Sequence, residues 1–105
     1  MTSYFVTGHP SALAWAAGEG IVATPVSHWG PQVRVRDGDV VMGTLPVQII
    51  AELTARGVRY LHLELDLPEG MRQQPLTVAD MKRFGARLSE FKAERVATNT
   101  EPTHE

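Results

Sequence analysis

Two short segments of the chain repeat one order of residue types, and both are typical of the turn that leads from a β-strand into an α-helix. Thr7-Gly8-His9-Pro10 ends the apolar run 4–7, and Gly43-Thr44-Leu45-Pro46 follows the apolar run 39–42. Glycine permits a tight bend at the end of a strand, and proline fits the first turn of a helix because its missing N–H is not needed there. Repeated strand-to-helix turns predict right-handed crossovers between parallel strands.

The segment between these two turns predicts a helix and two short strands. Strong helix formers over 11–17 predict the helix. The run 23–28 is expected to be an edge strand because it contains Pro25, which cannot donate a hydrogen bond to a neighbouring strand. A loop rich in glycine, proline and charge follows, with a short strand expected at 33–35.

The segment after the second turn predicts a helix, a strand and a final helix. Thr44 is expected to cap a helix over 45–56. Leucines alternate with polar residues over 58–66, which predicts a strand with one polar face. Thr77 and Asp80 have the spacing of a capping box, which marks the start of the last helix. The apolar face predicted for that helix comprises Met81, Phe84, Leu88 and Phe91.

This order of elements predicts one α/β domain over residues 1–96. Its mostly parallel sheet of four to five strands is expected to carry helices on both faces. A chain of 105 residues is long enough for one modest core and too short for two. Residues 97–105 are polar and are expected to form a flexible tail.

Composition excludes several classes of function. The chain has no cysteine, so thiolate catalysis and cysteine-bound zinc are excluded, and a cytoplasmic location is expected. No signal peptide and no run long enough to span a bilayer is evident, so no membrane partner is expected. Because the net charge is −2, binding of long nucleic acid through bulk charge is not expected either. A small anion held by backbone N–H groups remains compatible with this charge.

The two turns are the predicted anion-binding site. In a parallel sheet both lie at the carboxyl edge of the strands, where open α/β folds bind ligands, and helix N-termini there favour phosphate. An alternative is that short turns need glycine, threonine and proline for geometry alone. Ser11 and Thr44 most simply cap helices, and either hydroxyl could also hold a phosphate oxygen. The candidate ligand-binding residues in the two turns are Thr7, Gly8, Pro10, Ser11, Gly43, Thr44, Leu45 and Pro46.

Histidines supply the candidate proton-transfer groups. His9 lies within the first turn and is the candidate general acid or base, the alternative being an exposed residue at the helix start. His28 follows a predicted strand and is a further candidate for ligand binding at the same edge. His62, Glu64 and Asp66 alternate along one strand. A metal cluster is the less favoured interpretation of them, and a solvated or interface-facing side is preferred, so no metal or other cofactor is expected.

Three segments resemble a family of small stand-alone CRISPR-associated proteins that accompany type III systems. These are Phe5–Ala12, Gly38–Val47 and Arg59–Pro68, and the likeness extends over about residues 4–91. The Gly-Thr-Leu-Pro-Val and Leu-Asp-Leu-Pro stretches are its most specific parts. In that family the first turn often has the sequence Ser/Thr-Arg-His, and Gly8 stands here in place of the arginine. The resemblance therefore implies weaker phosphate binding or slower turnover at this position.

The resemblance implies a ring nuclease with a Rossmann-like, CARF-like fold. Such proteins bind cyclic tetra-adenylate, the second messenger of type III systems, and cleave it without a metal. A ribose 2′-OH attacks the adjacent phosphorus and leaves a 2′,3′-cyclic phosphate. Relatives act as homodimers with the ring on the two-fold axis, and His9 would be the catalytic acid or base. A sensor or sponge that binds the ring without cleaving it is the alternative.

Overall fold

A five-stranded sheet forms the centre of the molecule. The computed structural model describes residues 1–70 and 75–96, and the predicted tail over 97–105 lies outside them. The strand order is β2-β1-β3-β4-β5. The first four strands are parallel and β5 runs antiparallel to β4, so the predicted mostly parallel sheet is confirmed. The strands are β1 (Ser3–Val6), β2 (Thr24–Val26), β3 (Val40–Gly43), β4 (Arg59–Glu64) and β5 (Arg87–Phe91).

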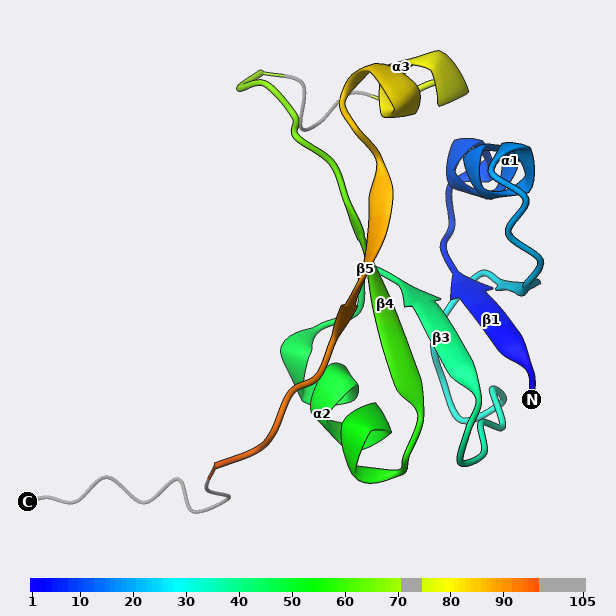
Figure 1. Ribbon diagram of the computed structural model, residues 1–105, viewed down its shortest axis with the longest axis vertical. Coiled ribbons are helices and arrows are strands. Elements are labelled where there is room, and N and C mark those ends of the chain that lie inside the picture. Colours follow the sequence, from blue (N-terminus) through cyan, green and yellow to red (C-terminus); the bar gives the residue numbers. More distant parts are fainter. Residues whose placement is uncertain (71–74, 97–105) are drawn as a thin grey trace, which may run out of the picture.

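Helices cover both faces of the sheet, as predicted. On one face, α1 (Pro10–Gly18) and α3 (Val78–Arg83) lie side by side and pack over Phe5 and Met42. On the other face, α2 (Val47–Ala55) packs over Val41 and Tyr60 (Figure 1). Successive strand residues point to opposite faces, so each strand contributes to both apolar clusters. This arrangement is consistent with a Rossmann-like fold.

The last predicted helix includes Leu88 and Phe91, whereas α3 ends at Arg83, so this prediction is wrong. Its capping box is present, with the Asp80 N–H donating to Thr77 Oγ1 at 3.0 Å and the Thr77 N–H donating to Asp80 Oδ2 at 3.1 Å. The helix ends at Arg83, and Gly85 adopts a φ of +72°, which is typical of a glycine that terminates a helix. Leu88 and Phe91 then belong to β5, where pairing with the open edge of β4 replaces helical hydrogen bonds.

Two further predictions also need correction. The second helix begins at Val47 with Pro46 as its N-cap, so Thr44 does not cap it. Residues 33–35 form no strand among the described residues. Val33 and Val35 are nevertheless buried in the apolar cluster that contains Ile50 and Leu53 of α2, here called the α2 cluster. The expected edge strand with Pro25 is confirmed as β2, at one border of the sheet. No helix among the described residues is long and apolar enough to cross a membrane.

Asp39 fixes the start of β3 to the start of β1. It is only 5% exposed, and its carboxylate accepts hydrogen bonds from the N–H groups of Thr2 and Arg36, both at 2.9 Å. Those two hydrogen bonds hold the pKa of the Asp39 carboxyl below its ordinary value of 3.8, against the opposing effect of burial. The ionised form is therefore part of the folded structure.

Substitution Asp39→Asn should destabilise the protein near neutral pH and much less in acid. The folded-state pKa lies below the unfolded value, so the stabilisation is complete above 3.8 and disappears as the pH falls through the lower folded value. Urea unfolding of the wild type and the variant, at neutral pH and well below 3.8, measures this difference. A stability gap that stays the same at both pH values would contradict the assigned role.

Candidate functional site

A cavity of about 770 Å³ opens at the carboxyl edge of the sheet and joins residues of both predicted turns. The strand register pairs Val6 with Gly43, so Thr7 and Thr44 leave neighbouring strands next to each other. Such an edge, bounded by helix N-termini, is where open α/β folds bind ligands. The residues that line it are Thr7, His9, Pro10, Ser11, Thr44, Leu63, Leu65, Pro75, Leu76 and Met81.

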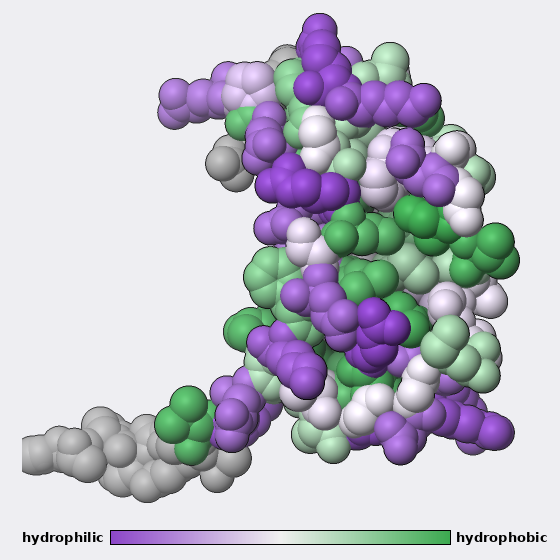
Figure 2. All heavy atoms as spheres, in the orientation of Figure 1, coloured by the Kyte–Doolittle hydropathy of each residue, from purple (hydrophilic) through white to green (hydrophobic). Residues whose placement is uncertain are grey.

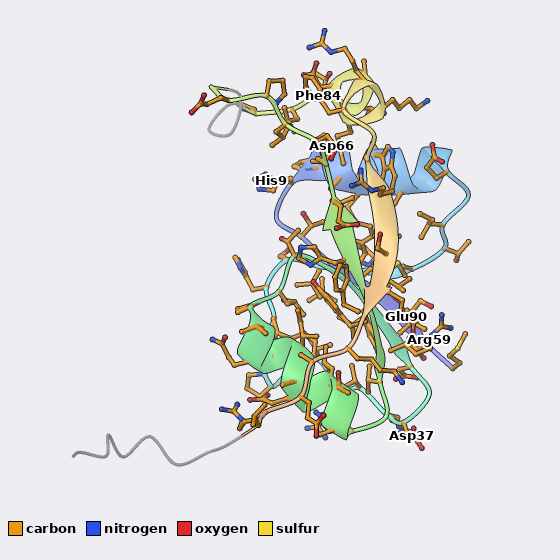
Figure 3. The ribbon with its side chains drawn as sticks, turned by 60° about the vertical axis from the view of Figure 1, so that its left-hand side comes forward. His9, Asp37, Arg59, Asp66, Phe84 and Glu90 are labelled. Atoms are coloured by element: carbon orange, nitrogen blue, oxygen red, sulfur yellow. The ribbon has the colours of Figure 1, made fainter. Side chains whose placement is uncertain are left out.

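The first turn presents hydroxyl groups and an imidazole. The His9 N–H donates to Thr7 Oγ1 at 3.1 Å, which leaves the Thr7 hydroxyl proton free for another acceptor. His9 is exposed and lies at the N-terminal end of α1, below the segment that contains Asp66 (Figure 3). Ser11 is half-buried, and no side chain caps this helix. The simplest interpretation of Ser11 and Thr44, that they cap helices, is therefore wrong.

The second turn is held by one buried hydroxyl group. Tyr60 is 1% exposed, and its hydroxyl accepts from the Leu45 N–H at 2.8 Å and donates to the Gly43 carbonyl at 2.9 Å. Burial raises the pKa of this phenol, with the Leu45 hydrogen bond acting in the opposite direction, so the hydroxyl stays protonated. His62 Nδ1 lies 2.8 Å from the same oxygen.

Substitution Tyr60→Phe should lower the free energy of unfolding by about 1–2 kcal/mol, because it leaves the buried Gly43 carbonyl and the part-buried Leu45 N–H without their partner. The second turn should also loosen, so Leu45 amide hydrogen exchange should accelerate beyond the global change in stability. Urea unfolding and exchange measurements check both effects. Unchanged exchange at Leu45 would show that the hydroxyl does not hold the turn.

Gly8 and Gly43, the glycines of the two turns, differ in whether a side chain would fit at their positions. A Cβ built on Gly43 would lie 2.5 Å from the Val6 carbonyl oxygen, and the φ of Gly43 is +149°, so a side chain there is excluded by close approach. A Cβ on Gly8 would meet only the Ser27 carbonyl, at 4.0 Å, and the φ of Gly8 is not positive. The backbone at Gly8 therefore accepts a Cβ without a close contact.

Some predicted ligand-binding residues do not line the cavity. Leu45 packs against the α2 cluster and its N–H is used by Tyr60, while Pro46 is exposed at the start of α2. His28 is exposed in a separate groove beside β2, where its carbonyl accepts from Gln32 Nε2 at 2.9 Å. Gly8 and Gly43 shape the turns, and no described residue accepts a hydrogen bond from the Gly8 N–H. The structure thus joins Thr7, His9, Pro10, Ser11 and Thr44.

The polar face of β4 is occupied by contacts to β5. Ser89 Oγ donates to Glu64 Oε1 at 2.5 Å, and Arg87 lies 3.6 Å from Glu64 and 3.2 Å from Asp66. Figure 2 shows hydrophilic residues gathered over α3 and the adjoining end of β5. No group of three or more potential metal ligands occurs among residues 1–70 and 75–96. These contacts give Glu64 and Asp66 partners on the neighbouring strand, and the interpretation as a solvated or interface-facing side stays a prediction.

The sequence did not single out the apolar half of the cavity. The sequence patterns place Leu63 and Leu65 in a strand and Met81 in a helix, and they assign no element to Leu76. Their role depends on β4 extending beyond β3, which the alternating leucines suggested but the residue types alone could not locate. Tyr60 was also missed, because a tyrosine in an apolar strand gives no sequence signal for the atom that its hydroxyl meets.

Comparison with known proteins adds a family to this description. Residues 4–94 match the family model "Putative CRISPR-associated protein (Cas_VVA1548)". Searches of curated proteins and of solved structures each gave no significant match. The match covers both turns, β1 from Tyr4 onward, the other four strands and every described residue that lines the cavity. The chain therefore belongs to this family of CRISPR-associated proteins.

Proposed function

We propose that this protein is a ring nuclease that binds cyclic tetra-adenylate and cleaves it without a metal. The observation that carries the proposal is the single cavity that joins the hydroxyls of both turns with the imidazole of His9 at the carboxyl edge of the sheet. Membership of a CRISPR-associated family supports a signalling nucleotide of type III systems as the ligand.

The groups of the cavity match the needs of this ligand. Each internucleotide phosphate carries one negative charge, and the Thr7 and Thr44 hydroxyls can donate hydrogen bonds to its oxygens. A helix N-terminus lies beside the first turn and adds the positive end of its dipole. Backbone and hydroxyl donors suit a chain whose net charge is −2.

The reaction is an intramolecular transfer of the phosphoryl group. The ribose 2′-oxygen forms a bond to the adjacent phosphorus, the bond from phosphorus to the 5′-oxygen breaks, and the 2′-hydroxyl proton is lost while the 5′-oxygen gains one. Cleavage at two opposite positions gives linear di-adenylate with a 2′,3′-cyclic phosphate. Positioning of the 2′-oxygen in line with the leaving oxygen supplies most of the acceleration. His9 transfers a proton at one of the two oxygens.

A homodimer completes the proposed assembly. A ring of four equal nucleotides has a two-fold axis, and a two-fold protein interface presents the same site to both halves of the ring. Each subunit would then contact two of the four phosphates, one at each turn. Size-exclusion chromatography with light scattering tests the predicted dimer directly.

A second candidate function is a sensor or sponge that binds the ring without cleaving it. Among the described residues that line the cavity there is no lysine or arginine, and His9 is the one titratable side chain of that set. A site with one proton-transfer group and no cation is better equipped for binding than for stabilising a transition state.

One assay separates these functions. The protein is incubated with labelled cyclic tetra-adenylate in the presence of EDTA, and the products are resolved by chromatography and the complex by gel shift. Linear di-adenylate with a 2′,3′-cyclic phosphate supports the nuclease. A shifted complex with an intact ring supports the sponge, and the absence of both binding and products contradicts both functions.

Substitution Thr44→Ala should weaken binding of cyclic tetra-adenylate about fivefold, because it removes one hydroxyl donor from the second turn. Thr24→Ala, an exposed threonine on the edge strand β2, is the matched control and should leave affinity unchanged. Isothermal titration calorimetry measures both. Equal affinities of the Thr44 variant and the wild type would count against the second turn as a phosphate site.

A further inference from the structure

The wall of the cavity opposite the hydroxyl groups is apolar. It consists of Leu63 and Leu65 from β4 and its continuation, Pro75 and Leu76 before α3, and Met81 within α3. Met81 is 2% exposed and anchors this wall in the core, whereas the three leucines are only half-buried. Half-buried leucines that border a cavity leave apolar surface in contact with water, and a ligand can remove that contact.

The strand register explains why the apolar wall lies opposite the hydroxyl groups of the two turns. Pairing of β3 with β4 ends at Gly43 and His62, so Leu63 and Leu65 extend past the end of β3. Leu63 and Leu65 share a face with Leu61, which packs against the cluster under α1 and α3. On this face they therefore stand over the turns that carry Thr7 and Thr44, with α3 as the outer boundary.

We infer that this apolar wall is a purine-binding subsite, with the base lying against Leu63, Leu65, Leu76 and Met81 while its phosphate contacts the first turn. The inference rests on the proposed function and adds a base site to it. A nucleotide has an apolar planar base and an anionic phosphate. The cavity likewise has an apolar wall of leucines and Met81 on one side and the hydroxyl groups of the two turns on the other. Its volume of about 770 Å³ lies within the range of small-molecule sites.

The chemistry of the wall also sets a preference among bases. Among the described residues of this wall, no side chain carries a hydrogen-bond donor or acceptor other than the weakly accepting sulfur of Met81. The wall therefore contacts the flat face of a base, and the affinity follows the area covered. A purine covers more of the leucine surface than a pyrimidine does, so adenine nucleotides should bind more tightly than uracil nucleotides.

Methyl NMR tests the subsite with adenosine 5′-monophosphate as the probe. The ring current of the base should shift the methyl resonances of Leu63, Leu65, Leu76 and Met81. Ribose 5-phosphate should leave them in place, and uridine 5′-monophosphate should give smaller shifts at equal concentration. Equal shifts from adenosine 5′-monophosphate and ribose 5-phosphate, or no shift with adenosine 5′-monophosphate, would overturn the inference.

This result is independent of ring cleavage. If cyclic tetra-adenylate proves not to be a substrate, the methyl shifts with adenosine 5′-monophosphate still decide the base subsite. If the ring is cleaved and the methyls do not respond to the mononucleotide, the subsite is wrong and the proposed function stands.

A pair of leucine variants supplies the second measurement. Leu65→Ala should weaken adenosine 5′-monophosphate binding about tenfold, because it removes most of one apolar contact surface. Leu88→Ala is the matched control: Leu88 packs against the same cluster from β5 and does not line the cavity. Equal affinities of the two variants would contradict the placement of the base on this wall.

Discussion

Replacement of His9 by alanine should lower the rate of ring cleavage about 100-fold or more, while the affinity for cyclic tetra-adenylate changes little. A positioned acid or base contributes to the transition state, so its removal lowers kcat much more than it weakens binding. Of the described residues that line the cavity, His9 alone has a titratable side chain, so none of the others can replace it. Single-turnover cleavage and titration of the uncleaved ring measure the two quantities separately.

Two controls accompany the His9 variant. His9 is exposed and its side chain caps no helix, so the melting temperature of the variant should match that of the wild type. Added imidazole should restore part of the lost rate if a proton-transfer group is what the variant lacks. A loss of affinity as large as the loss of rate would make His9 a binding residue and favour the sponge.

Replacement of Gly8 by arginine should strengthen ring binding about tenfold or more at low salt. The first turn accepts a side chain, since the nearest atom to a Cβ at this position is 4.0 Å away and the φ of Gly8 is not positive. An arginine would place a forked, charged donor beside the phosphate, and hydrogen bonds to charged groups are stronger than neutral ones. The turn is exposed, so added salt should reduce the gain.

Gly8→Ala is the control for the backbone at this turn. It removes the freedom of glycine without adding a charge, and its affinity should equal that of the wild type. If Gly8→Arg also binds the ring no more tightly than the wild type at low salt, then no phosphate lies near the first turn, and the proposed position of the ligand is wrong.

Local sequence patterns predicted most of the sheet. The two turns, the edge strand with Pro25 and the alternating strand β4 all follow from residue types at fixed spacing, and the structure confirms them. The helix over 11–17 was also predicted within one residue at each end. These elements depend on short-range effects, namely proline and glycine geometry, helix propensity and strand alternation.

The wrong predictions depend on contacts distant in sequence. Leu88 and Phe91 fit the spacing of a helix after Met81, but the open edge of β4 offers hydrogen bonds to an antiparallel strand, and Gly85 ends the helix before them. There Arg59 of β4 donates two hydrogen bonds to Glu90 of β5, at 2.9 and 3.1 Å (Figure 3). A single-sequence pattern contains no information about which edge is free.

In the candidate site, too, the features set by local sequence were predicted and those set by contacts between distant segments were not. The hydroxyls and His9 were predicted because turns at a carboxyl edge have a known geometry. The apolar wall and the Tyr60 hydroxyl were not, because both depend on how far β4 extends past β3 and on what its side chains then meet. The register of β4 is defined only relative to β3, so the residue pattern of β4 by itself does not give it.

A crystal structure of the His9→Ala variant with uncleaved cyclic tetra-adenylate tests the central claim most directly. The account predicts phosphate oxygens within hydrogen-bond distance of the Thr7 and Thr44 hydroxyls, with the ring over the carboxyl ends of β1 and β3. A more basic groove lies elsewhere, between residues 29–36 and α2, and includes Arg34, Arg36 and Arg56. A ring bound in that groove, with the carboxyl edge empty, would contradict the account.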